Sequence, residues 1–221
     1  MLYRLFTVIT AFILAATAFA GIVVGDTAVE LSGQQINVRE TNTGDFLADA
    51  IKNISGADIA LLPSMVIKDS VTISKGQVDE QMLRGLLSSP SSPIVILTMK
   101  SSLLRTMLER SVSKVPDPNT AFLQISGIEV TFDSSKPSGS RIATIKLHGK
   151  VLADDKTTLT VAMPRELGLG GAGYLRIIPD SVIGAMTTTD YSVMDAIKHE
   201  FSRLGGKVTP SVDGRLTDKA K

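Results

Sequence analysis

A few polar side chains and a glycine-rich segment, 168–174, give this chain its candidate chemistry. Arg39, Asn42 and Lys68 offer positive charge and hydrogen-bond donors. The segment contributes three candidate contacts, which are Gly170, Gly171 and Gly173. Backbone amides in a glycine loop can form a concavity that accepts an anion, so these residues predict a site for a small anion. The alternative is that Arg39 and Asn42 tie a loop to a sheet and the glycines turn a corner.

Hydrolysis of phosphate esters by metal ions requires other residues, because two cations and an activated water must be held by clustered Asp, His and Asn side chains. The chain has two histidines. His148 stands beside an expected hairpin turn, and His199 lies on an expected helix, away from its apolar face. Both are predicted to be surface residues. We therefore predict no catalytic residue, no metal and no cofactor.

The first twenty residues predict export. They carry one basic residue, Arg4, then a run rich in Leu, Phe, Ile and Ala that ends in Ala18-Phe19-Ala20. This is the layout of a secretory signal peptide with a small-x-small cleavage site, and it indicates a periplasmic or extracellular protein. The alternative is a retained anchor, because the uncharged run 5–25 is just long enough to cross a bilayer. The chain has no cysteine, which excludes lipid attachment and disulfides.

Charge and length bound the remaining chain. Without Arg4, 22 basic residues balance 22 acidic ones, because the full chain has 23 and 22. No basic block stands out, which argues against a nucleic-acid partner and against an electrostatic membrane patch. About 200 residues suffice for one sizeable core. We expect a signal peptide over 1–20, an N-terminal lead-in over 21–37 and a single domain over 38–221.

In the first half, helical and strand patterns alternate. The expected elements are a helix over 44–53, a strand over 57–62, a helix capped by Asp79, a strand over 94–99 and a helix from Ser101 or Ser102. Asn42 or Thr43 is expected to cap the first helix. In the second helix four apolar residues are expected to face inward: Met82, Leu83, Leu86 and Leu87.

The second half changes to the period of strands. Alternating segments predict strands over 122–125, 128–132, 141–147 and 157–161, joined in part by short hairpin connections. A last helix carries Val193, Ile197 and Phe201 on one face, with Asp190 as its expected cap. The chain thus predicts an α+β (mixed α/β) fold with a mixed sheet, antiparallel hairpins and about four helices.

Six short motifs, in this order, resemble the C-terminal domain of the 5′-nucleotidase family over roughly 38–217. They are Glu40-Thr41-Asn42-Thr43-Gly44 with 47–50, then 56–60, 67–70, 122–127, Gly170-Gly171-Ala172-Gly173-Tyr174 and Gly214-Arg215-Leu216. The resemblance implies the family's mixed fold and a nucleoside pocket built partly by the glycine-rich loop. In two-domain members of the family, a preceding metallophosphoesterase domain holds the metals and the catalytic groups.

This chain departs from the family at the positions that the resemblance places against a nucleoside. Lys68 stands where an arginine is expected, and it keeps the charge but loses the planar fork. Ser91 lies where a stacking aromatic is expected, and Glu166 stands at the position of a second one. Ala172 replaces a carboxylate. Because stacking contributes roughly 1–3 kcal/mol per base, the pocket implied here, lined by Lys68, Ser91, Glu166 and Tyr174, is a remodelled one.

Three functions follow as hypotheses. The first is an exported stand-alone module, not an enzyme by itself, that binds a nucleotide-like or anionic small molecule in connection with nucleotide catabolism. The second is the substrate-binding half of a split nucleotide phosphohydrolase that a separate metallophosphoesterase completes. The third is an interaction domain of the cell envelope.

Overall fold

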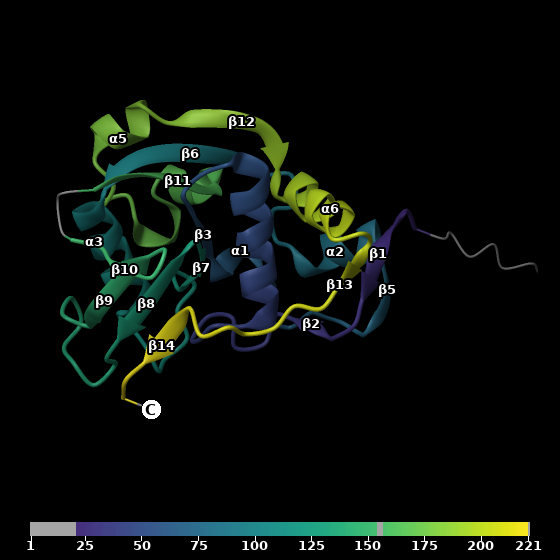
Figure 1. Ribbon diagram of the computed structural model, residues 1–221, viewed down its shortest axis with the longest axis horizontal. Helices are drawn as coiled ribbons and strands as arrows, with labels where there is room; N and C mark the ends of the chain where they lie inside the picture. Colours follow the sequence, from purple (N-terminus) through teal and green to yellow (C-terminus); the bar gives the residue numbers. More distant parts are fainter. Residues whose placement is uncertain (1–20, 154–156, 221) are drawn as a thin grey trace, which may run out of the picture.

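The centre of the molecule is a five-stranded mixed sheet (Figure 1). The computed structural model describes residues 21–153 and 157–220, so the expected signal segment lies outside the described residues. The strands in spatial order are β12 (Thr187–Ser192), β6 (Pro93–Lys100), β11 (Thr158–Pro164), β3 (Ile59–Pro63) and β7 (Leu123–Ser126). β11 runs parallel to β3 and antiparallel to β6, and β7 runs antiparallel to β3.

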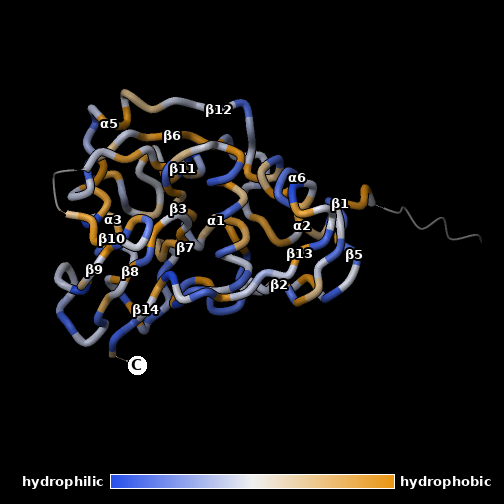
Figure 2. The backbone as a smooth tube through the Cα atoms, viewed as in Figure 1, coloured by the Kyte–Doolittle hydropathy of each residue, from blue (hydrophilic) through white to orange (hydrophobic). Residues whose placement is uncertain are grey.

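The side chains on each face of this sheet belong to a separate hydrophobic core. Successive side chains of a strand point to opposite faces, and β3 accordingly sends Ile59 and Leu61 into one core and Ala60 and Leu62 into the other. The second core is completed by three helices: α1 (Asn42–Ser55), α2 (Glu80–Leu86) and α6 (Val193–Arg203). Apolar segments accordingly gather along the central strands, and polar segments lie in the outer loops (Figure 2).

The other face packs against α3 (Ser101–Val112) and against a second sheet. That sheet has the order β10-β9-β8-β14. Its strands are β10 (Lys150–Val151), β9 (Ile142–Leu147), β8 (Ile128–Phe132) and β14 (Leu216–Asp218). β8 and β9 form the expected antiparallel hairpin, whereas β14, near the C-terminus, joins β8 in parallel.

Two smaller sheets contain the first two strands of the described residues. One has the order β13-β1-β5, and the other pairs β2 with β4. Their strands are β13 (Lys207–Val208), β1 (Val23–Thr27), β5 (Gly76–Asp79), β2 (Leu31–Ser32) and β4 (Thr72–Ile73). The segment 21–37, expected as a lead-in, thus contributes two strands.

Four further elements are short. They are η1 (Ser64–Val66), α4 (Arg165–Gly168), η2 (Gly171–Gly173) and α5 (Asp180–Gly184). The described residues therefore contain six α-helices, against about four expected. The two additional ones span 4 and 5 residues, too few to leave a helical period in the sequence. No helix within residues 21–153 and 157–220 has the length and apolarity that a bilayer crossing requires.

The helix ends correct three expectations. Thr41, rather than Asn42 or Thr43, caps α1, because its side chain accepts the Gly44 N–H. Ser192, rather than Asp190, caps α6 and forms a capping box with Asp195, whereas Asp190 lies in β12. Asp79 caps α2 as expected, but Met82 is 45% exposed, since it lies in the first turn beside the cap.

Candidate functional site

Several loops converge at one edge of the central sheet. β3 and β11 are parallel and both end there, at Pro63 and Pro164. β6 and β7 begin at the same edge, because Pro164 pairs with Ile94 and Pro63 pairs with Leu123. The edge where parallel strands end is the usual place for ligands in sheets of this kind. We call this region the loop edge.

Ser91, Glu166, Gly170 and Gly171 lie together at the loop edge. Ser91 and Glu166 are exposed, and Ser92, beside Ser91, donates its hydroxyl to the Glu166 carboxylate. Gly171 packs on the Glu166 backbone, where an added Cβ would lie 2.6 Å from the carbonyl oxygen. The loop thus requires glycine at this position for close packing.

Two side chains, Tyr174 and Arg110, hold the glycine-rich loop in place by hydrogen bonds. Tyr174 is fully buried, and its phenol donates to the Ala121 carbonyl at 2.8 Å. Burial raises the pKa of this phenol well above its usual range. Arg110 donates to the Ala172 carbonyl and lies against Gly173. The Tyr174 ring, predicted to line the ligand site, therefore lies in the core in this structure.

Lys68, Arg39 and Asn42 lie elsewhere along the edge. Lys68 is exposed after η1, where its segment pairs with residues 86–88. Arg39 is exposed, and its carbonyl accepts from Gln124 on β7. Asn42 donates to the Glu30 carbonyl, which ties the loop before α1 to the body. Within residues 21–153 and 157–220, no hydrogen bond joins any of these three residues to the glycine-rich loop.

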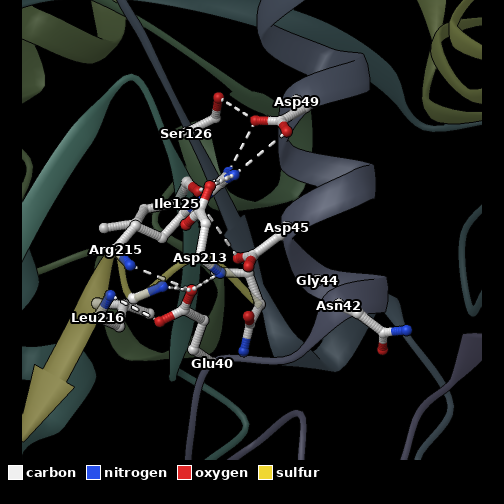
Figure 3. Close-up of polar contacts among 12 residues, drawn as sticks. Glu40, Asn42, Gly44, Asp45, Asp49, Ile125, Ser126, Asp213, Arg215 and Leu216 are labelled. Atoms are coloured by element: carbon white, nitrogen blue, oxygen red, sulfur yellow. Dashed lines mark hydrogen bonds and ion pairs between the residues drawn. The ribbon is translucent and has the colours of Figure 1, made fainter. Parts of the chain in front are cut away.

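A second polar centre, which the sequence did not reveal, surrounds Arg215 (Figure 3). We call it the arginine cluster, and its members are Glu40, Asp45, Asp49, Asp213 and Arg215. Arg215 bonds Asp49 at 2.7 Å through one terminal nitrogen and Asp213 at 2.8 Å through Nε. Burial by itself would lower the pKa of Arg215, but the carboxylates of Asp213 and Asp49 outweigh it and raise this pKa above its ordinary value.

Glu40 clamps the C-terminal segment to the start of α1. Its Oε1 accepts the backbone N–H groups of Asp213, Gly214 and Arg215 at 2.9 to 3.2 Å. Its Oε2 accepts the Leu216 N–H at 2.9 Å. Hydrogen bonds to a charged acceptor are stronger than neutral ones, so one carboxylate positions the strand β14.

Asp45 has a different environment in the same cluster. Its side chain is 1% exposed, and neither carboxylate oxygen has a hydrogen-bond partner among the described residues. The nearest ionic contact is with Arg215, whose Nε lies 3.5 Å from Oδ1. The pKa of Asp45 is raised to about 9, chiefly by burial; the opposing effect of Arg215 is smaller, and the neighbouring carboxyl group of Glu40 adds to the rise.

Cavities open on both sides of Arg215. One of about 370 Å³ is lined by residues that include Asp45, Asp213 and the buried Glu200 of α6. The other, of about 420 Å³, lies beside the β8–β9 hairpin and is lined in part by Lys146 and His148. Both histidines of the chain are exposed, as predicted. The sequence marked Glu40 and Arg215 within motifs but gave no signal that residues this far apart meet.

Comparison with known proteins identifies the architecture. The family model for the C-terminal domain of 5′-nucleotidase matches residues 23–177. The trifunctional nucleotide phosphoesterase protein YfkN of Bacillus subtilis is 31% identical over 208 residues, covering 88% of this chain and 14% of that protein. A snake venom 5′-nucleotidase of Crotalus adamanteus is 27% identical and is covered over 36% of its length. The chain therefore spans well under half of these relatives.

A solved structure agrees with this assignment of the fold. The 5′-nucleotidase precursor of Thermus thermophilus superposes with a TM-score of 0.79 at 23% identity, covering 90% of this chain and 40% of that one. The expected mixed α/β fold of a 5′-nucleotidase C-terminal domain is thus confirmed.

Proposed function

This chain belongs to the family of 5′-nucleotidase C-terminal domains, and from that premise we propose that it is an exported binding module that does not itself hydrolyse phosphate esters. Its ligand is a small nucleotide-like or anionic molecule bound at the loop edge. The proposed contacts are Lys68, Ser91, Glu166 and the glycine-rich loop at Gly170, Gly171 and Gly173, with Arg39 and Asn42 in support. Within the loop, the amides of Gly171 and Gly173 are the proposed donors, because the Gly170 N–H already donates to the Leu167 carbonyl at 2.8 Å. The module serves nucleotide catabolism in the periplasm or outside the cell.

One observation carries this proposal: the glycine-rich loop keeps the form of a ligand loop while Tyr174 is withdrawn from it. Gly170, Ala172 and Gly173 have φ values of 88°, 55° and 83°. Neighbouring residues in such conformations can direct backbone N–H groups into one concavity that attracts anions. Because Tyr174 is buried, its ring offers no stacking surface for a base. The loop therefore supports recognition of an anionic group rather than of an aromatic base.

A ligand screen tests the proposal. Nucleosides, nucleotides and inorganic phosphate are added to the purified protein, and thermal unfolding is followed, because a ligand stabilises the fold by RT ln(1 + [L]/Kd). We expect phosphate and nucleotides to raise the unfolding midpoint and nucleosides to leave it unchanged. Lys68→Ala should weaken this effect, and Lys75→Ala, at an exposed position after β4, is the matched control. A flat screen would favour the envelope interaction domain instead.

The non-catalytic part of the proposal has its own test. The protein is incubated with nucleotides and Mn²⁺, Zn²⁺ or Mg²⁺, and phosphate release is measured. We expect none above background. Metal-dependent release that persists through purification would refute this part and leave the ligand site standing.

Exposed apolar side chains favour a second candidate, the split hydrolase. Met65, Leu169 and Leu175 are 41%, 44% and 63% exposed, and all three belong to segments of the loop edge. Apolar side chains gathered around a ligand site are suited to contact with another protein. A separate metallophosphoesterase would be the partner. Co-elution of the two proteins, lost on Leu175→Ser, is expected; if the chain stays monomeric beside that partner, this candidate is excluded.

A further inference from the structure

The arginine cluster carries more negative than positive charge. Four carboxylates, those of Glu40, Asp45, Asp49 and Asp213, surround the one guanidinium of Arg215. Two of them are buried, Glu40 at 6% and Asp45 at 1% exposure. Buried carboxylates are costly unless they are paired, hydrogen-bonded or bound to a metal. Glu40 meets this requirement through four backbone N–H groups, whereas Asp45 has only the long ionic contact of 3.5 Å with Arg215.

Arg215 has no donor left for Asp45. A guanidinium carries five N–H groups. Nε donates to Asp213, one terminal nitrogen donates to Asp49 and to the Ile125 carbonyl, and the other donates to Asp49 and Asp213. The distance of 3.5 Å from Nε to Asp45 Oδ1 is accordingly too long for a hydrogen bond. Asp45 thus offers two oxygens that accept no hydrogen bond from the described residues.

We propose that Asp45, Glu40 and Asp213 form a binding site for a divalent cation of the size of calcium. One carboxylate oxygen from each residue can be chosen so that all three lie within 4.8 Å of one another (Figure 3). Calcium binds oxygens at 2.3–2.6 Å, so two ligands on opposite sides of it are separated by roughly 4.6–5.2 Å. Magnesium, at 2.0–2.1 Å, spans at most about 4.2 Å and requires stricter geometry. An upper bound of 4.8 Å fits the reach of calcium, and the flexible coordination of calcium suits ligands that come from separate segments of the chain.

The three ligands differ in how free they are. Asp45 leads, because neither of its oxygens has a hydrogen-bond partner among the described residues. Glu40 contributes Oε2, which accepts a single N–H from Leu216. Asp213 is exposed on the wall of the cavity of about 370 Å³ that also reaches Asp45, and this cavity gives a cation and its waters a path to the site. The cation site does not depend on the ligand proposed for the loop edge, because none of its three residues is among the proposed contacts of that ligand.

Calcium titration of the intact exported chain tests the proposal. Sites of this kind in extracellular modules bind calcium with Kd of roughly 10⁻⁴–10⁻³ M. About 10 mM calcium chloride should then lower the equilibrium constant for unfolding roughly ten- to a hundredfold relative to sodium chloride of equal ionic strength. Isothermal titration calorimetry should give one calcium per chain.

Asp45→Asn is the decisive variant, because it keeps the shape of the side chain and replaces the carboxyl group by an amide, which cannot ionise to hold the cation. It should abolish the calcium-dependent shift, and calorimetry on the same folded variant should show no binding. Asp117→Asn, at an exposed position after α3, is the matched control and should respond as the wild type does. An unchanged wild-type unfolding curve in calcium, or an undiminished shift in Asp45→Asn, would overturn the proposal.

Discussion

Replacing Glu40 by glutamine tests whether one carboxylate holds the C-terminal segment in place. Glutamine retains one acceptor oxygen and presents an NH2 group where the other oxygen was. If that oxygen faces the three N–H groups at Oε1, the NH2 group opposes the Leu216 N–H, which lies 2.9 Å from Oε2. The reverse orientation leaves three N–H groups without their acceptor. Either way, buried donors lose their partner.

The expected cost follows from these bonds. One buried N–H without a partner costs about 1–3 kcal/mol, and the loss of the negative charge weakens the bonds that remain. We expect Glu40→Gln to lower the free energy of unfolding by about 2–4 kcal/mol. In a domain of this size this corresponds to a fall in the unfolding midpoint of roughly 5–15 °C.

Urea unfolding with a chelator present measures this cost without any contribution from bound cations. Glu129→Gln is the matched control, because Glu129 is 58% exposed and lies 3.6 Å from Lys146. Exposed pairs of this kind contribute roughly 0–1 kcal/mol. Hydrogen exchange at the Leu216 amide should accelerate in Glu40→Gln and stay unchanged in the control. If the two variants lose the same stability and the Leu216 amide stays protected, the clamp has no energetic role.

Two further substitutions test the core at Tyr174 and the contact between α1 and α6 at Glu200. Tyr174→Phe removes the hydrogen bond to the Ala121 carbonyl and should cost about 1–2 kcal/mol in urea unfolding, while phosphate binding at the loop edge stays unchanged; a loss of binding at full stability would place Tyr174 in the site. Burial opposes ionisation of Glu200, but hydrogen bonds from Arg203 and Asn53 outweigh it and lower its pKa below 4.5. Ionised Glu200 therefore contributes to the free energy of unfolding above pH 4.5, and this contribution is lost as pH falls through the lowered pKa. Wild type and Glu200→Gln should differ in stability at about pH 6 and converge in acid. A difference that stays constant with pH would contradict the assignment.

The sequence predicted the local secondary structure of the first half well. The helix over 44–53 and the strand over 57–62 correspond to α1 and β3, because their apolar periods reflect burial on one face or both. The cap of the first helix was predicted one or two residues too late. Thr41, Asn42 and Thr43 can all cap a helix, and the choice of Thr41 depends on the backbone position that Gln124 fixes by accepting the Thr41 N–H.

The candidate site likewise has features that the sequence predicted and features that only the tertiary structure shows. The sequence by itself determined that a glycine-rich loop and a few cations are present, since residue type alone sets positive-φ tolerance and charge. Tertiary structure decided that Tyr174 lies beneath that loop and that Glu166 meets Ser92 at its rim. It also decided that Glu40 and Asp45 meet Arg215, which follows about 170 residues later. Such contacts leave no period or spacing in a sequence, because the packing of α1 against β7 and the return of the C-terminal segment bring them together.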